Sequence, residues 1–170
     1  MLIRPATESD VPAILALIRE LAEFEKLSHA CIATEDLLAR HLFGKNGTER
    51  VAEALVAEDS AQPPAPGAQQ SVVAYAIFFK TFSTFLALPG IYLEDIYVQP
   101  AHRRRGVGKA MLKRLAALAV ERGYGRVEWS VLDWNAPAIA FYRSIGATPL
   151  DEWTMFRLTG SALSAFAQPT

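Results

Sequence analysis

A predicted strand, a short basic turn and a predicted amphipathic helix follow one another between residues 91 and 122. This order constrains the fold more than any other feature of the chain. Residues 91–98 are mostly apolar or aromatic, as is typical of a strand. The helical run carries its apolar side chains on one face, at Val107, Met111, Leu112, Leu115, Leu118 and Ala119. A strand that leads directly into a helix is the repeating step of an α/β sheet, so we expect an α/β fold.

The turn between these two elements reads Arg103, Arg104, Arg105, Gly106, Val107, Gly108, Lys109. The first N–H groups of a helix have no intrahelical partner, and the helix dipole gives that end a partial positive charge. Glycines at 106 and 108 would let an anion approach these donors, and the four cationic side chains add positive charge. The turn therefore predicts a cradle for a pyrophosphate group. A basic turn that merely caps a surface helix remains the alternative.

Two other phosphate-binding motifs do not fit the same segment. The dinucleotide fingerprint requires a third glycine at position 111, which is Met111. The P-loop requires Lys-Ser or Lys-Thr after a glycine at a fixed spacing, and no such pair occurs. The pattern that remains is R-x-x-G-x-G.

Further strands and helices alternate along the chain. Strands are predicted at 2–4, 50–58, 72–80, 125–132 and 153–158, and helices at 10–25, 34–44 and 135–145, followed by a short tail helix. Residues 60–71 are rich in Pro, Ala and Gln and are expected to form a flexible hairpin loop rather than a domain boundary. A length of 170 residues suits one domain.

Composition excludes several classes of function. A net charge of -1 gives no reason to expect nucleic-acid binding, and no apolar run reaches the ~20 residues that span a bilayer. The single cysteine, Cys31, cannot form an internal disulfide, and His29, His41 and His102 lack the spacing of metal ligands. We therefore expect a cytoplasmic protein with no metal and no membrane association.

The spacing Arg103-x-x-Gly106-x-Gly108 after residues 92–98 resembles the acetyl-CoA site of the GNAT superfamily of N-acetyltransferases. Other segments resemble its spermidine/spermine (diamine) branch, which includes thialysine acetyltransferases. These segments are 3–7, 20–25, Trp134-Asn135, Phe141-Tyr142 and Gly146-Ala147. The resemblance implies one GNAT domain over residues 1–170, with a mixed central sheet of about six to seven strands flanked by helices.

The same resemblance implies that acetyl-CoA is the acetyl donor and assigns its binding residues. They are Ile96, Tyr97, Val98, Arg103, Arg104, Arg105, Gly106, Val107, Gly108, Lys109, Asn135 and Tyr142. The backbone at 96–98 would lie along the pantetheine arm, where an N–H can polarise the thioester carbonyl. Asn135 is also a good helix N-cap, which is the interpretation that the sequence alone favours.

Two side chains are candidates for the proton transfers. Glu94 would accept the proton of the amine, and the alternative is an ion pair with a neighbouring arginine. By resemblance, Tyr142 would donate a proton to the departing thiolate, and the alternative is core packing. Glu94 and Asp95 are adjacent, so on a regular strand only one of them faces the substrate, and Asp95 would hold a substrate nitrogen or brace a loop.

Acidic residues near the matched motifs suit a small cationic acceptor, namely a diamine, a polyamine or a thialysine- or lysine-like amine. The positions that border the acceptor by resemblance are Phe24, Glu25, Glu94, Asp95, Glu128, Trp129, Ser130 and Trp153. Many of these carboxylates could equally be solvated surface. We expect direct attack in a ternary complex. The family resemblance also implies a homodimer whose interface includes residues 151–158. The alternatives are an acceptor of another amine class, such as a protein N-terminus or an aminoglycoside, and a module that binds acetyl-CoA without catalysis.

Overall fold

The computed structural model describes residues 1–59 and 71–169. Two compact units divide the chain, Met1–Ser130 and Val131–Thr170, and each is described by itself. The loop predicted at 60–71 falls, apart from Ser71, outside the described residues.

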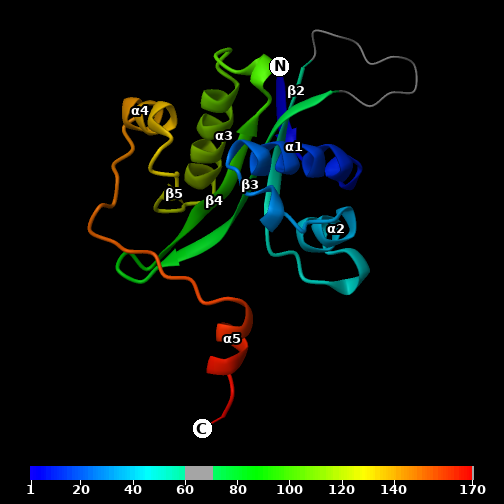
Figure 1. Cartoon of the computed structure of the whole chain (residues 1–170). Coiled ribbons are helices and arrows are strands. Elements are labelled where there is room, and N and C mark those ends of the chain that lie inside the picture. Colours follow the sequence, from blue (N-terminus) through cyan, green and yellow to red (C-terminus); the bar gives the residue numbers. More distant parts are fainter. Residues whose placement is uncertain (60–70, 170) are drawn as a thin grey trace. The chain divides into compact units, whose positions relative to one another are not determined.

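The first unit is built on one five-stranded sheet in the order β1-β2-β3-β4-β5 (Figure 1). The strands are β1 Leu2–Pro5, β2 Glu53–Glu58, β3 Val72–Ser83, β4 Leu88–Val98 and β5 Val127–Trp129. Neighbouring strands are antiparallel from β1 to β4, whereas β4 and β5 are parallel. Helix α3 (Val107–Glu121) connects the two parallel strands, which confirms the strand-turn-helix step predicted at 91–122.

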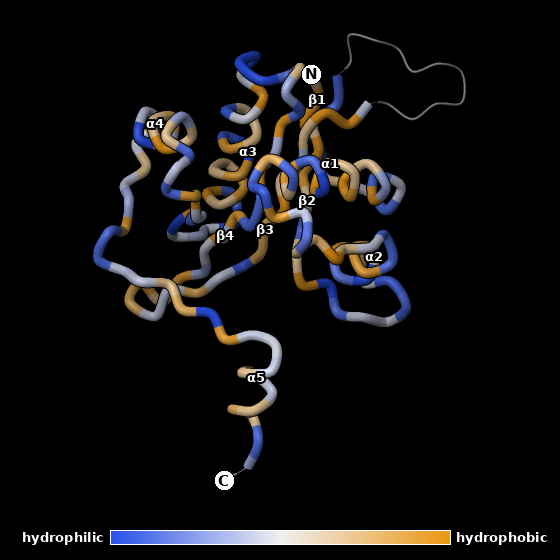
Figure 2. The backbone as a smooth tube through the Cα atoms, in the orientation of Figure 1, coloured by the Kyte–Doolittle hydropathy of each residue, from blue (hydrophilic) through white to orange (hydrophobic). Residues whose placement is uncertain are grey.

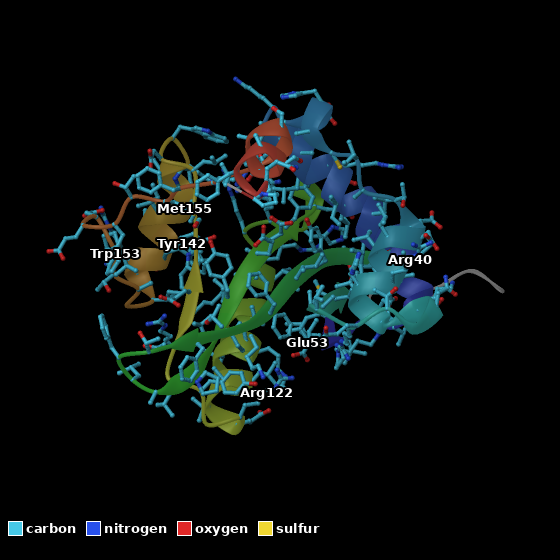
Figure 3. The ribbon with its side chains drawn as sticks, turned by 90° about the horizontal axis from the view of Figure 1, so that it is seen from below. Arg40, Glu53, Arg122, Tyr142, Trp153 and Met155 are labelled. Carbon is cyan, nitrogen blue, oxygen red and sulfur yellow. The ribbon has the colours of Figure 1, made fainter. Side chains whose placement is uncertain are left out.

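Helices cover both faces of this sheet. Helices α1 (Val11–Phe24) and α2 (Glu35–Phe43) lie on one face and α3 on the other (Figures 1 and 3). The core on the α1 and α2 face comprises Ile14, Leu17, Leu42, Ala54, Val56, Val72, Tyr75, Ile77 and Tyr97. Figure 2 shows the hydrophobic residues concentrated along the central strands and the adjoining helices.

Two ion-pair clusters fix the ends of helices to the sheet. Asp10, just before α1, is fully buried and accepts hydrogen bonds from the Arg4 guanidinium at 2.7 and 2.9 Å. Burial favours a higher pKa for Asp10, but the hydrogen bonds from Arg4 and Thr7 outweigh it and lower the pKa. At the C-terminal end of α3, the Arg122 guanidinium donates hydrogen bonds to both carboxylate oxygens of Glu53 on β2, at 2.6 and 2.7 Å (Figure 3). A bidentate pair of this kind fixes direction as well as distance.

Local signals predicted helix α2 closely. Thr34 caps its N-terminus, since its hydroxyl accepts a hydrogen bond from the Leu37 N–H at 3.3 Å. Gly44 ends the helix with a left-handed φ of 72°, as glycines commonly do.

The second unit contains α4 (Ala136–Ser144) and α5 (Gly160–Phe166), as predicted for 135–145 and for the tail. The prediction of a strand at 153–158 was wrong, because this segment forms no strand in the structure. A strand needs a partner for its backbone groups, and none of the described strands pairs with this segment. For this reason the sheet has five strands rather than about six to seven. No helix in the described ranges 1–59 and 71–169 has the length and apolar character needed to cross a membrane.

Candidate active site

The candidate site lies on β4 and on the turn that follows it. The pairing of β4 with β3 is regular except at one point, because Ile77 pairs with Asp95 whereas Phe78 pairs with Leu93. Glu94 is therefore the extra, unpaired residue of a β-bulge and is exposed to solvent. The expectation that Glu94 and Asp95 face different sides assumed a regular strand, whereas the bulge makes the strand irregular at this position; Glu94 is exposed and Asp95 half-buried.

The pairing between β4 and β5 ends at the same place. The last pair is Leu93 with Trp129, so among the described strands residues 94–98 of β4 have a partner only in β3. Apart from the Val98 carbonyl, which accepts a hydrogen bond from Arg103, backbone donors and acceptors on this edge are available to an extended ligand, as at any open strand edge. This geometry fits the prediction that the backbone at 96–98 lies along a pantetheine arm.

Carboxylates with unusual proton affinity lie beside the bulge. Burial, reinforced by the negative charges of Glu94 and Glu25, raises the pKa of Asp95 to about 6. Burial also raises the pKa of Glu25, the residue that follows α1. Neither Asp95 nor Glu25 forms an ion pair with any residue in the described part of the chain. The site thus holds uncompensated negative charge, which suits a cationic ligand.

The turn after β4 leaves the start of α3 open. Gly106 is the N-cap residue of α3, with a φ of 81° that favours glycine and with no side-chain cap. At Gly108, an added Cβ would meet only Val98 Cγ2, at 3.8 Å, which is ordinary contact. Neither backbone strain nor packing requires glycine at position 108, although alanine is the better helix former. The space above this helix end is therefore available to a ligand.

The cationic residues of the turn divide into two groups. Arg103 lies against the protein, because its Nε donates to the Val98 carbonyl at 2.8 Å and its guanidinium lies over the rings of Phe24 and Tyr97, at 5.0 and 5.2 Å. Arg104, Arg105 and Lys109 are exposed like Arg103, and of these three Arg105 alone has a carboxylate among the described residues within 4.0 Å, that of Asp59. Arg103 thus braces the end of β4, whereas the side chains of Arg104 and Lys109 are available to bind an anion.

Two acidic residues that were not predicted as site residues support this region. Glu20 on α1 accepts hydrogen bonds from the Tyr97 hydroxyl and from Gln99 Nε2, both at 3.1 Å. Asp59 lies 3.2 Å from His102 Nε2 and 4.0 Å from Arg105. Their partners are distant in sequence, so no local pattern identifies either one.

The predicted acceptor residues on β5 lie beside β4. Glu128 forms an ion pair with Arg126 at 2.7 Å and is half-buried, so it is not simply solvated surface. The Ser130 hydroxyl lies 2.7 Å from the Tyr92 hydroxyl, and Trp129 is half-buried. Strand pairing therefore places 127–129 beside 91–93, and the hydroxyl contact with Tyr92 keeps Ser130 next to them.

Three predicted residues belong to the second unit. Asn135 caps α4, since its Oδ1 accepts a hydrogen bond from the Ala138 N–H at 3.3 Å, as the sequence favoured. Tyr142 projects from α4 (Figure 3), and burial raises the pKa of its phenol, which is therefore protonated at neutral pH. Trp153 is 73% exposed, on the segment after α4.

The pKa of Asp95 predicts how its replacement changes stability. The folded protein binds this proton more tightly than the unfolded chain, so ionisation destabilises the fold increasingly between pH 3.8 and about 6, and by a constant amount above that. We expect Asp95→Asn to raise Tm at pH 7.5, with a smaller gain at pH 5. Differential scanning fluorimetry of the ligand-free protein measures both, and Asp36→Asn, on an exposed ion pair of α2, is the control. An Asp95→Asn protein with an unchanged or lower Tm at pH 7.5 would contradict this description.

No cluster of three or more His, Cys, Asp or Glu within 1–59 and 71–169 could hold a metal ion.

Solved structures with the same fold include an integron cassette protein from the mobile metagenome of V. cholerae, with a TM-score of 0.77 and 22% identity over 99% of this chain and 98% of that one. Another is a ribosomal-protein-alanine N-acetyltransferase from Brucella melitensis, with a TM-score of 0.69 and 22% identity over 94% and 100% of the two chains. At this identity the likeness concerns the fold alone.

Relatives found by sequence share a higher identity with this chain than those solved structures do. The chain is 41% identical to a thialysine N-epsilon-acetyltransferase of Mus musculus over 97% of this chain and 96% of the relative. It is 37% identical to an L-ornithine N5-acetyltransferase of Arabidopsis thaliana over 96% of this chain and 86% of the relative. Residues 52–147 match the model of the Acetyltransferase (GNAT) family. The chain therefore belongs to the GNAT family and is an N-acetyltransferase of the branch that contains thialysine and ornithine acetyltransferases.

Proposed function

We propose that this enzyme transfers the acetyl group of acetyl-CoA to a primary amine of a small cationic acceptor, by direct attack in a ternary complex. The acceptor class is a diamine, a polyamine or a thialysine- or lysine-like amine. The observation that carries this proposal is the arrangement of charge along β4. Carboxylates without a cationic partner among the described residues lie beside its bulge and suit an amine, and the strand then leads into the open, basic N-terminal end of α3, which suits the pyrophosphate of acetyl-CoA.

The donor-binding part of the proposal rests on the turn at 103–109. Acetyl-CoA, the donor of the family, supplies an activated acetyl thioester when bound. The first N–H groups of α3 and the exposed side chains of Arg104, Arg105 and Lys109 would bind its pyrophosphate, and the open edge of β4 at 96–98 would bind the pantetheine arm. Asn135 and Tyr142 complete the set that resemblance assigns.

Glu94 is proposed to accept the proton of the reacting amine. A primary amine with a pKa near 10.4 is almost fully protonated at pH 7, and its deprotonation costs roughly 4.6 kcal/mol. Glu94 is exposed at the bulge, where it can take this proton directly or through water. As the amine nitrogen bonds to the acetyl carbon and the C–S bond breaks, Tyr142 is proposed to return a proton to the thiolate.

The acceptor class is supported by charge and by the relatives. Asp95 and Glu25 lack cationic partners in the described part of the chain, so a second amino group of the acceptor would neutralise them. The related mouse and Arabidopsis enzymes are named for thialysine and L-ornithine, two amino acids that carry an additional amino group.

We also propose that the enzyme is a homodimer whose interface includes residues 151–158. Large apolar side chains are exposed on this segment of the second unit, with Met155 at 69% and Phe156 at 90%. Light scattering coupled to size-exclusion chromatography should give twice the 18.6 kDa chain mass. A monomer mass at micromolar concentration would contradict the proposal.

Gly108→Ala tests the donor site. An added methyl group fits within the protein but would obstruct a phosphate at the start of α3, so we expect KM for acetyl-CoA to rise by about tenfold or more without loss of Tm. Ala116→Ser, on the exposed face of the same helix, is the control. Unchanged KM in Gly108→Ala would exclude close approach of the pyrophosphate.

Glu94→Gln and Tyr142→Phe test the proton-transfer roles. We expect each to lower kcat by about a hundredfold or more, with KM for acetyl-CoA little changed. The Glu94→Gln defect should shrink as pH rises towards 10, because the amine then loses its proton to solvent. Glu121→Gln removes an exposed carboxylate of α3 that pairs with Arg114 and is the matched control. Full activity in both variants would disprove the assigned roles.

A further inference from the structure

Tyr75 carries a buried hydroxyl that has no partner. It is the fourth residue of β3 and is 0% exposed, and its hydroxyl oxygen makes no hydrogen bond with any described residue. An unsatisfied buried hydroxyl costs about 1–3 kcal/mol, so such groups usually have a role. The neighbouring Tyr97 differs, since its hydroxyl bonds to Glu20.

The register of the sheet places Tyr75 next to the candidate site. Tyr75 pairs with Tyr97 and Ile77 pairs with Asp95, so Tyr75 and Asp95 are diagonal neighbours on one face of the β3-β4 pair. This is the face that α1 covers, and the residue after α1 is Glu25. Burial raises the pKa of the Tyr75 phenol, and the charges of Asp95 and Glu25 act in the same direction. The hydroxyl is thus within electrostatic range of both carboxylates.

These groups together have the composition of a site for an ammonium ion. Two carboxylates whose pKa values are raised by burial share the region with a phenol, and no described cation pairs with either carboxylate. The phenol has one donor, which suits a carboxylate, and acceptor lone pairs, which suit an N–H group. A bound ammonium would satisfy the hydroxyl and neutralise the carboxylates at once.

We propose that Tyr75 determines acceptor specificity, its O–H donating to Asp95 and its oxygen accepting a hydrogen bond from the non-reacting ammonium group of the acceptor. The proposal rests on the proposed function, in which the exposed Glu94 serves the reacting amine. The buried Tyr75 and the half-buried Asp95 then hold the second amino group, and so distinguish diamines from monoamines.

The test compares putrescine, ornithine and thialysine with butylamine, which has one amino group. Steady-state kinetics of the wild type and Tyr75→Phe give kcat and KM for each amine. The substitution removes one oxygen and preserves packing. For the best diamino acceptor we expect KM to rise by about tenfold or more, the scale of a hydrogen bond to a charged group. KM for butylamine and for acetyl-CoA should change by less than about twofold, and kcat should be retained.

A stability measurement separates this role from a structural one. Because the hydroxyl has no partner in the ligand-free protein, Tyr75→Phe should leave Tm unchanged or raise it. Tyr124→Phe, which removes a hydroxyl next to Arg122, is the matched control and should leave the kinetics of all four amines unchanged.

Three results would overturn the proposal. They are an unchanged KM for every diamino acceptor, an equal rise for butylamine, and a Tm lower by several degrees, which would assign the hydroxyl to a structural water. Failure of the wild type to acetylate any of the amines would instead reject the proposed function, and the role of Tyr75 with it.

Discussion

The β-bulge at Glu94 is the constraint on which the candidate site depends. One unpaired residue shifts the register between β3 and β4, and the β4-β5 pairing ends beside it. Residues 94–98 have one open edge where β5 ends, and Glu94 is exposed with the half-buried Asp95 next to it. A regular strand would instead give Glu94 a partner on β3.

Charge is arranged in two different ways along the same strand. Beside the bulge, half-buried carboxylates without cationic partners among the described residues favour a positively charged ligand, and burial together with the charges of Glu94 and Glu25 raises the pKa of Asp95. Beyond the end of β4, open backbone donors and exposed arginines favour a negative ligand. A reaction between a cationic amine and an anionic cofactor needs both environments close to one strand.

Features set by neighbouring residues were predictable from the sequence. The strand-turn-helix step at 91–122, the Thr34 cap and the Gly44 helix end follow from local patterns, and the motif Arg103-x-x-Gly106-x-Gly108 indicated the family. The bulge was not predictable, because it depends on register between two strands. The segment 153–158 was wrongly predicted as a strand because it is apolar enough for one, while the absence of a pairing partner among the described strands cannot be read from local sequence. One missed signal was local: Tyr75 is the only hydroxyl in the apolar run 72–79.

The central claim is acetyl transfer from acetyl-CoA to a small cationic amine. The most direct test measures CoA release with a free-thiol reagent. The panel comprises spermidine, spermine, putrescine, lysine, ornithine, thialysine, an aminoglycoside and a peptide amine. We expect turnover of at least one small diamino or polyamino acceptor well above that of the aminoglycoside and the peptide. Binding of acetyl-CoA without turnover of any amine, or a clear preference for the aminoglycoside or peptide, would contradict it.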